Sequence, residues 1–360
     1  MIGSSKWDID TPALVLDLEV MQRNIQRMAT TLRAVGVGWR PHTKAIKTPA
    51  IAHQLLRAGA LGVTCAKVGE AEVMAAAGIR DILIANQVVG ASKIARLVNL
   101  LPYADVVVAV DSRQNVEELN RAACDVARRL RVVIELDIGM HRAGVVPADV
   151  VEFARLVAAQ PGLRFAGVMG WEGQTVGIAD QSEKERAVVD SVRLLTDCAR
   201  ACGDGGLACE VVSCGGTGTY AMTSRLPGVT EVQAGGGIFA DLYYREVMHV
   251  DHEYALTVLA TVTSRPTPTR IICDAGKKTM SSDAAVPRPL IDAEVESVGL
   301  SAEHARISLR APCETPRIGD KIEFVVGYSD TTTMLHDEIY AVRGERLEAI
   351  WPILGRGKLR

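Results

Sequence analysis

The chain has 360 residues, of which 48% are hydrophobic and 23% charged, and its net charge at pH 7 is −3. This composition is typical of globular proteins and excludes disordered and fibrous classes. The chain has no polybasic run and no apolar stretch approaching the ~20 residues of a membrane span, so neither nucleic acid nor a membrane is an expected partner. The N-terminal residues show no signal-peptide pattern, and we expect a cytoplasmic protein.

The eight cysteines are expected to be free thiols, because a chain of this length builds a large core without disulfides. Cys198 and Cys202 are four residues apart on a helical pattern, a spacing that also suits a zinc site. No second pair with ligand spacing exists, so packing in the core is the better interpretation.

Short strands alternate with helices through the middle of the chain. The strands are rich in Val and Ile, as strands buried on both faces of a parallel sheet are, and we predict them at Gly38–Thr43, Gly62–Ala66, Ile82–Ala85, Asp105–Val110, Val132–Asp137, Phe165–Gly170, Glu210–Ser213 and Glu231–Ala234. The helical patterns between them include Glu70–Ala77, Gln114–Leu130, Pro147–Gln160 and Ser182–Cys202. Eight such strands predict an α/β fold of the (β/α)₈ TIM-type barrel class. An open doubly wound sheet is the alternative, but no strand is followed by G-x-G-x-x-G.

Helical periodicity ends near residue 250, and β-rich runs separated by Pro and Gly follow. This pattern predicts an all-β C-terminal domain, with strands at Tyr254–Ser264, Arg270–Asp274, Ala293–Gly299, Ala305–Leu309, Lys321–Val326 and Glu338–Val342. We therefore predict a barrel over residues 19–250 and a β domain over residues 251–360. The strand pattern at residues 10–18 has no place in the barrel, and we expect it to join the β domain.

Two glycine-rich turns follow the seventh and eighth predicted strands, where barrels of this class commonly bind phosphate. The expected phosphate ligands are the backbone N–H groups of Gly216, Gly218, Gly235 and Gly236 and the hydroxyl of Thr217. The alternative is that these glycines only make tight turns.

Lys44 stands where the first barrel strand should end, in a largely apolar mouth. Desolvation and the neighbouring Arg40 would make it a nucleophilic amine. The alternative is a solvated rim lysine, as we expect Lys47 to be. An amine opposite a phosphate site suggests pyridoxal 5′-phosphate (PLP) bound as a Schiff base. Arg142 would then donate to the phenolic oxygen of PLP, unless it forms a surface ion pair.

These motifs resemble those of fold-type III PLP enzymes, which have an alanine racemase-like barrel. The resemblance is greatest to the D-threonine aldolase, D-serine dehydratase and 3-hydroxy-D-aspartate aldolase family. The matching segments follow the family order over nearly the whole chain and are Asp10–Leu18, Arg40–Lys44, Lys67–Ala71, Asp137–Gly144, Gly215–Gly218, Glu231–Gly235, Asp274–Gly276 and Leu335–Asp337. The resemblance implies that Lys44 carries PLP, that His42 and Arg142 lie against it, and that the glycine turns hold its phosphate. It also implies a homodimer in which the β domain of one subunit completes the site of the other.

Two positions depart from the family pattern. Family members bind a divalent metal through a histidine followed two residues later by Asp or Cys; here Asp330 matches the second ligand, but Tyr328 replaces the histidine. Neutral tyrosine is a poor ligand, which leaves Mg²⁺ or Mn²⁺ held by Asp330 and water as the form such a site would take. The family aldolases also carry histidines after the sixth strand, where this chain has Trp171 and Glu172. Glu172 is therefore the candidate acid–base group, and its alternative is an ion pair with an arginine.

The resemblance implies first a lyase that cleaves a D-3-hydroxy amino acid to glycine and an aldehyde. The alternatives are a dehydratase of the D-serine type, which releases ammonia and an oxo acid, and an amino-acid racemase, in which Tyr328 or a residue of the partner subunit would be the second base. The fourth possible function is that of a protein that binds PLP but catalyses no reaction. Loss of the metal histidine weakens the aldolase and the dehydratase hypotheses equally, because both reactions use a metal at the β-hydroxyl. The aldolase remains our first choice.

Overall fold

The computed structural model describes residues 1–360, which form two compact units. The first, here called the barrel unit, consists of Arg27–Lys44, Pro49–Gly235 and Lys358–Arg360. The second, here called the β unit, consists of Met1–Gln26, Ala45–Thr48 and Gly236–Gly357. No helix has both the length and the apolar character that crossing a membrane requires. All eight cysteines are free thiols, as predicted.

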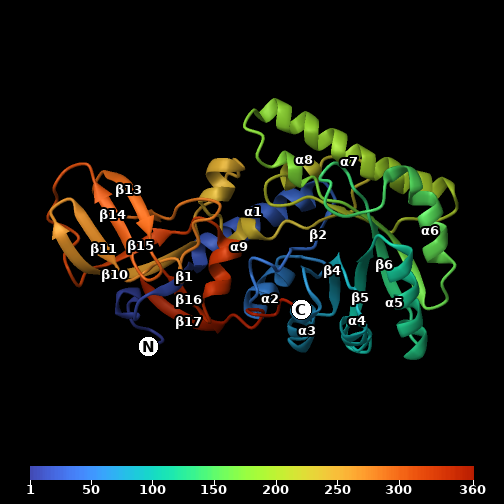
Figure 1. Ribbon diagram of the computed structural model, residues 1–360, viewed down its shortest axis with the longest axis horizontal. Coiled ribbons are helices and arrows are strands. Elements are labelled where there is room, and N and C mark those ends of the chain that lie inside the picture. Colours follow the sequence, from blue (N-terminus) through green and yellow to red (C-terminus); the bar gives the residue numbers. More distant parts are fainter. The chain divides into compact units, whose positions relative to one another are not determined.

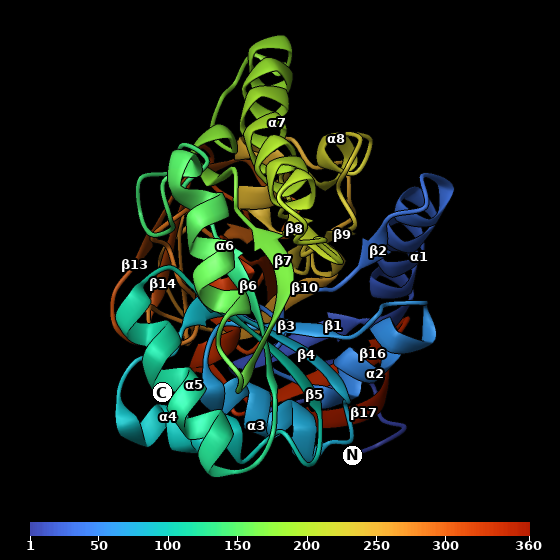
Figure 2. The same ribbon diagram turned by 90° about the vertical axis from the view of Figure 1, so that its right-hand side faces the viewer.

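The barrel unit contains eight parallel strands that follow one another around a ring (Figures 1 and 2). They are β2 (Gly38–Trp39), β3 (Val63–Cys65), β4 (Asp81–Gln87), β5 (Asp105–Val110), β6 (Leu130–Glu135), β7 (Leu163–Met169), β8 (Val211–Cys214) and β9 (Glu231–Val232). Their order is β2-β9-β8-β7-β6-β5-β4-β3. A parallel bridge between His42 and Thr64 joins the two ends of this order, so the sheet closes. The predicted TIM-type barrel is confirmed.

The strand predicted at Gly38–Thr43 is regular only over its first two residues, because Pro41 has no N–H to donate to a ladder. Its backbone nevertheless continues to pair on both sides. The Arg40 N–H donates to the Val232 carbonyl at 2.9 Å, and the Thr64 N–H donates to the Pro41 carbonyl at 2.9 Å. This irregular pairing carries the chain to Lys44 at the carboxyl end of the barrel.

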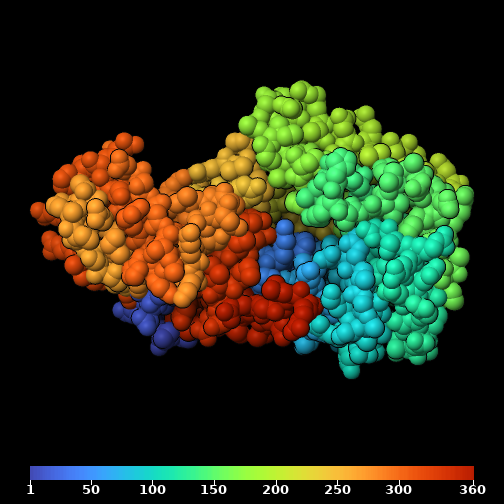
Figure 3. All heavy atoms as spheres, viewed as in Figure 1, coloured from blue at the N-terminus to red at the C-terminus, as the bar shows by residue number.

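Helices follow the strands and cover the outside of the ring (Figure 2). They are α2 (Pro49–Arg57), α3 (Val68–Ala76), α4 (Ala91–Val98), α5 (Arg113–Asp125), α6 (Val150–Ala158), α7 (Gln181–Asp204) and α8 (Tyr220–Thr223). Helix α1 (Leu18–Ala34) precedes β2, and only its part from Arg27 onward belongs to the barrel unit. Helix α5 begins at Arg113, one residue before the predicted Gln114, and the Ser112 hydroxyl caps it by accepting from the Asn115 N–H. Its predicted end at Leu130 is wrong, because Leu130 already belongs to β6. Helix α7, in yellow-green, lies on the outer surface of the unit in Figure 3.

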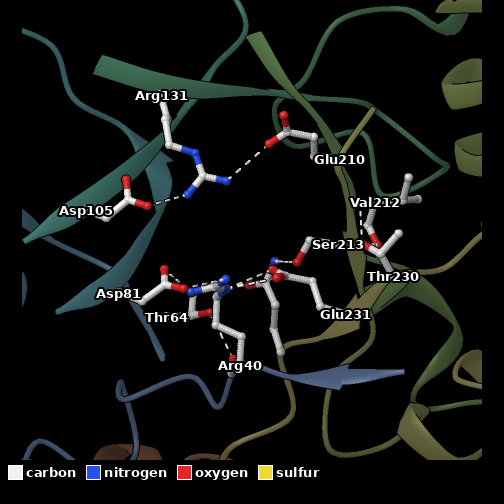
Figure 4. Close-up of polar contacts among 11 residues, drawn as sticks. Arg40, Thr64, Asp81, Asp105, Arg131, Glu210, Val212, Ser213, Thr230 and Glu231 are labelled. Atoms are coloured by element: carbon white, nitrogen blue, oxygen red, sulfur yellow. Dashed lines mark hydrogen bonds and ion pairs between the residues drawn. The ribbon is translucent and has the colours of Figure 1, made fainter. Parts of the chain in front are cut away.

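Two groups of ion pairs lie among the strands at the amino-terminal end of the barrel (Figure 4). In one, Arg40 donates to Glu231 at 2.9 Å and to Asp81 at 2.6 Å. In the other, Arg131 donates to Asp105 at 2.7 Å. Asp81, Asp105 and Glu231 are the first residues of their strands. These charges therefore close the barrel at the end opposite to its mouth, where side chains serve stability.

The β unit is built on a nine-stranded sheet. Its strands are β1 (Ala13–Asp17), β10 (Leu256–Thr267), β11 (Arg270–Cys273), β12 (Arg288–Pro289), β13 (Val295–Leu300), β14 (Ala305–Leu309), β15 (Lys321–Val325), β16 (Glu338–Arg343) and β17 (Arg346–Pro352). Strand β1 lies between β10, to which it is antiparallel, and β16, to which it is parallel. The sequence did not predict β17. A short helix, α9 (Ser329–Thr332), follows β15 and carries Asp330.

Candidate active site

Three side chains meet at the mouth of the barrel unit. The Lys44 ammonium lies 5.5 Å from the ring centroid of Trp171, and the Arg142 guanidinium carbon lies 5.5 Å from the same centroid. Trp171 follows the end of β7, and Lys44 follows the strand segment that closes the ring. The indole therefore brings together the amine and the guanidinium that the sequence predicts at the site, because cations are attracted to aromatic faces.

Glu172 lies behind the first glycine turn and has no exposed surface. Its carboxylate accepts hydrogen bonds from the hydroxyls of Thr219 (2.7 Å) and Thr223 (2.6 Å) and from the Gly215 N–H (3.2 Å). No arginine pairs with it, so the predicted alternative of an ion pair does not apply. These contacts support a positioning role for Glu172, which fixes the turn that leads to Thr217. Its acid–base role stays a prediction.

Several glycines of the two turns are required because a side chain would not fit at their positions. Only Gly215 has a positive φ, +76°, which favours glycine. A Cβ on Gly216 would lie 2.9 Å from the Trp171 indole nitrogen, and a Cβ on Gly235 would overlap the carbonyl oxygen of His42. In the β unit, a Cβ on Gly236 would overlap the Tyr244 hydroxyl. Neighbouring groups fill the space beside three of these glycines. The alternative that the glycines serve the turns and their packing therefore explains part of the glycine-rich sequence.

The barrel unit nevertheless fits PLP. The N–H groups of Gly218 and Gly235 donate no hydrogen bond within the chain, which leaves them available to a phosphate. Thr217 is buried beside Gly218 in the first turn. At the mouth, the Lys44 amine lies close to an aromatic ring. These groups supply the covalent attachment and the anion ligands that PLP requires.

Arg142 has a carboxylate on its other side. Its guanidinium lies 3.8 Å from Glu135 at the end of β6, and the Gln87 amide donates to the same carboxyl at 2.5 Å. Burial raises the pKa of Glu135, and the hydrogen bond from Gln87 and the charge of Arg142 only partly oppose this. Arg142 itself remains more than half exposed. Glu135 and Gln87 therefore support the inner side of Arg142.

The predictions that Arg40 lies beside Lys44 and that Lys47 is solvated are both wrong. Arg40 does not present its charge to Lys44, because its guanidinium is buried between Glu231 and Asp81. Burial opposes that charge, but the two carboxylates outweigh it and raise the pKa of Arg40. Lys47 is not a solvated rim lysine, because only 6% of its surface is exposed.

Tyr328 and Asp330 lie in the β unit, in a cluster with Tyr243 and Tyr244. The Tyr244 hydroxyl donates to the Asp330 carboxylate at 3.0 Å. Burial and the charge of Asp330 raise the pKa of Tyr328 well above its usual range, so its hydroxyl stays neutral. A single carboxylate already bound by a neutral phenol does not suit Mg²⁺ or Mn²⁺, which prefer several oxygen ligands with negative charge. The residues at this position do not fit the predicted metal.

Sequence reasoning missed three residues that the structure makes prominent. Trp171 was noted only as a departure from the family pattern, although an aromatic side chain directly after a barrel strand is a signal for a site residue. Glu135 has a weaker signal, as the last residue of a buried strand. Tyr244 has none, because its contact with Asp330 joins positions 86 residues apart.

Comparisons with known proteins identify the family of the whole chain. The model of the family described as "Alanine racemase, N-terminal domain" matches residues 16–242, and that described as "Putative serine dehydratase domain" matches residues 255–342. The chain is 34% identical to D-threonine aldolase of Arthrobacter sp over 97% of this chain and 93% of that one. It is also 34% identical to 3-hydroxy-D-aspartate aldolase of Paracoccus denitrificans (strain Pd 1222), over 99% and 94%. The crystal structure of D-threonine aldolase from Filomicrobium marinum, 35% identical, superposes with a TM-score of 0.96 and covers 100% of this chain and 99% of that one.

Proposed function

Because the chain belongs to the PLP-dependent family of D-threonine aldolases and 3-hydroxy-D-aspartate aldolases, we propose that it cleaves a D-3-hydroxy amino acid to glycine and an aldehyde. The observation that carries this proposal is the placement of Lys44 and Arg142 on the Trp171 ring, beside a glycine turn with an available N–H group. The similarity over the whole length to two aldolases supports the lyase reaction in particular.

Each residue of the barrel mouth has a proposed role. Lys44 would hold PLP covalently through its side-chain amine. Arg142 donates to the phenolic oxygen, and His42 lies against the ring. The proposed phosphate ligands are the N–H groups of Gly218, Gly235 and Gly236 and the hydroxyl of Thr217. The predicted ligand Gly216 is set aside, because its N–H already donates to the Thr219 hydroxyl at 3.1 Å.

The reaction needs a sink for one electron pair, and PLP supplies it when bound. A base removes the proton of the β-hydroxyl, the former O–H electron pair forms the second bond of the aldehyde C=O, and the Cα–Cβ bond breaks with its electron pair left on the Cα side. Cα then takes up a proton to give glycine, so that no oxidant or reductant is consumed. Glu172 remains our predicted acid–base group for these transfers, and Tyr328 is the group we would test for the racemase alternative.

Three further points belong to the proposal. The protein works as a homodimer in which the β domain of one subunit completes the site of the other. It acts in the cytoplasm on a small-molecule substrate. We propose as its domains a barrel over residues 19–250 and a β domain over residues 251–360, which the N-terminal strand at residues 10–18 joins. We do not include the metal at Asp330, because the residues there do not fit it.

Product analysis tests this function. The PLP-loaded protein is incubated separately with D-threonine, D-serine and 3-hydroxy-D-aspartate, and glycine, aldehyde, ammonia and the enantiomer of the substrate are measured. We expect glycine and an aldehyde in equal amounts from at least one substrate. Ammonia with an oxo acid would instead identify a dehydratase, enantiomer formation a racemase, and no product from any of them would contradict an enzyme of this class.

A further inference from the structure

The sequence at Gly327–Thr331 keeps the family layout except at one residue, Tyr328, which stands where family members have a metal-binding histidine. The second ligand position is unchanged and holds Asp330. The structure shows what surrounds this carboxylate in the β unit, and every contact used below lies within that unit.

One phenol binds the Asp330 carboxylate and a second packs beside it. The Tyr244 hydroxyl donates to Asp330 Oδ1 at 3.0 Å, and Tyr328 lies two residues before Asp330 in the same cluster. The rings pack edge to face, with the Tyr328 centroid 5.7 Å from that of Tyr244 and 5.2 Å from that of Tyr243. Edge-to-face packing of this kind stabilises each ring in its place. The Tyr244 phenol therefore already occupies one acceptor site of the carboxylate, and the packed rings fill the space beside it.

Asp241 fixes this cluster from behind. It is completely buried and accepts hydrogen bonds from the Tyr244 N–H at 2.8 Å and from the N–H and hydroxyl of Ser329 at 2.6 and 2.7 Å. It thereby joins the segment that carries Tyr244 to the start of α9, which carries Asp330. Because its carboxylate is engaged by these three donors, Asp241 does not supply a second anionic ligand for a metal at Asp330.

We propose that a cluster of Asp330 with the phenols of Tyr244 and Tyr328 replaces the divalent metal of the family in this protein, and that Tyr328 is the residue that decides the replacement. In place of a cation with charge +2, the neutral O–H of Tyr244 binds the Asp330 carboxylate, and the packed ring of Tyr328 stands where the family has its nitrogen ligand. Restoring a histidine at position 328 removes this ring and adds a nitrogen ligand two residues before the carboxylate. The inference rests on the family membership but not on which reaction the protein catalyses.

Mn²⁺ binding to the full-length protein, followed by calorimetry and by the electron paramagnetic resonance of free Mn²⁺, tests the proposal. The Asp330→Asn variant is measured beside each protein, so that only Mn²⁺ that depends on this carboxylate is counted. We expect no such Mn²⁺ in the natural sequence, about one equivalent in Tyr328→His, and none in Tyr328→Phe, which keeps the ring packing without adding a ligand. The melting temperature of every variant is measured to establish that it folds.

Two results would overturn the proposal. One is an equivalent of Mn²⁺ bound by the natural sequence and lost in Asp330→Asn. The other is a folded Tyr328→His variant that still binds none, because position 328 would then not decide the loss. If Asp330→Asn fails to fold, Asp330→Ser takes its place as the reference. Since the readout is metal binding, these results do not depend on whether the proposed aldolase activity is found.

Discussion

Glu172 is fully buried without a cationic partner, and hydrogen bonds alone stabilise its charge. Three donors of the first glycine turn and of α8 surround it. A buried carboxylate with this environment is costly to alter, because each of these donors would lose its acceptor. The contacts therefore link the conformation of the turn that holds Thr217 to a single side chain after β7.

Replacing Glu172 with Gln tests the positioning role. The amide nitrogen would face hydroxyl and N–H donors, so we expect the free energy of unfolding to fall by about 1–3 kcal/mol and PLP to bind more weakly. Thr223→Val is the matched control, since it removes one donor and should reproduce part of both effects. Thermal denaturation and PLP titration measure them. Unchanged stability and PLP affinity, with a lower kcat and an altered pH profile, would instead support the acid–base role.

Glu135 makes the stability of the protein depend on pH. Burial raises its pKa in the folded state, so the folded protein holds this proton more tightly than the unfolded chain. Its contribution to stability is therefore present below the pKa of the unfolded chain and is lost as pH rises through the folded-state pKa. Glu135→Gln resembles the protonated acid, and its melting temperature relative to the natural protein should increase from pH 5 to pH 8. A difference that is constant or decreases over this range would contradict the assignment; Asp105→Asn, exposed at the other end of the barrel, is the control.

At the scale of elements, the mouth of the barrel depends on the close approach of the segment after β9 to the segment after β2. Gly235 permits this approach because a side chain there would meet the backbone of His42. Backbone atoms in a closed barrel have little freedom to move aside. The glycine is thus required by the closure of the ring, in addition to the N–H group that it offers.

Gly235→Ala should therefore destabilise the barrel by on the order of 3 kcal/mol. Gly177→Ala is the control, because no atom lies within 4 Å of the position its Cβ would take and its φ is not in the left-handed region. We expect the control to change the free energy of unfolding by less than about 0.5 kcal/mol. Denaturant titration compares the two. Equal stabilities would show that the two segments do not approach each other as described.

At the scale of the whole molecule, local patterns predicted the barrel well. Strand β5 was predicted at its observed bounds, because a continuous run of Val and Ala between turn signals has few other interpretations. The C-terminal strand β14 was predicted with equal accuracy. Strand β17, by contrast, mixes charged and apolar residues without strict alternation, and only its pairing with β16 defines it.

The parts that the sequence could not predict depend on contacts between distant positions. Arg40 binds Glu231, which is 191 residues further along the chain. No local pattern shows that the Arg40 side chain turns to this distant carboxylate and not toward Lys44, four residues away. The same holds for the burial of Lys47. The family resemblance identified Lys44, Arg142 and the glycine turns, but the neighbours of each side chain became known only from the fold.

Lys44, at the mouth of the barrel, is the residue that we propose carries PLP. Reduction of the PLP-loaded protein with borohydride, followed by mass spectrometry of its peptides, tests this proposal most directly. We predict a pyridoxyl label on Lys44 alone and its complete loss in Lys44→Ala. Lys47 and Lys67 provide internal controls, because they are the two lysines that follow Lys44 most closely along the chain. A label on either of them, or a label retained in Lys44→Ala, would contradict the account.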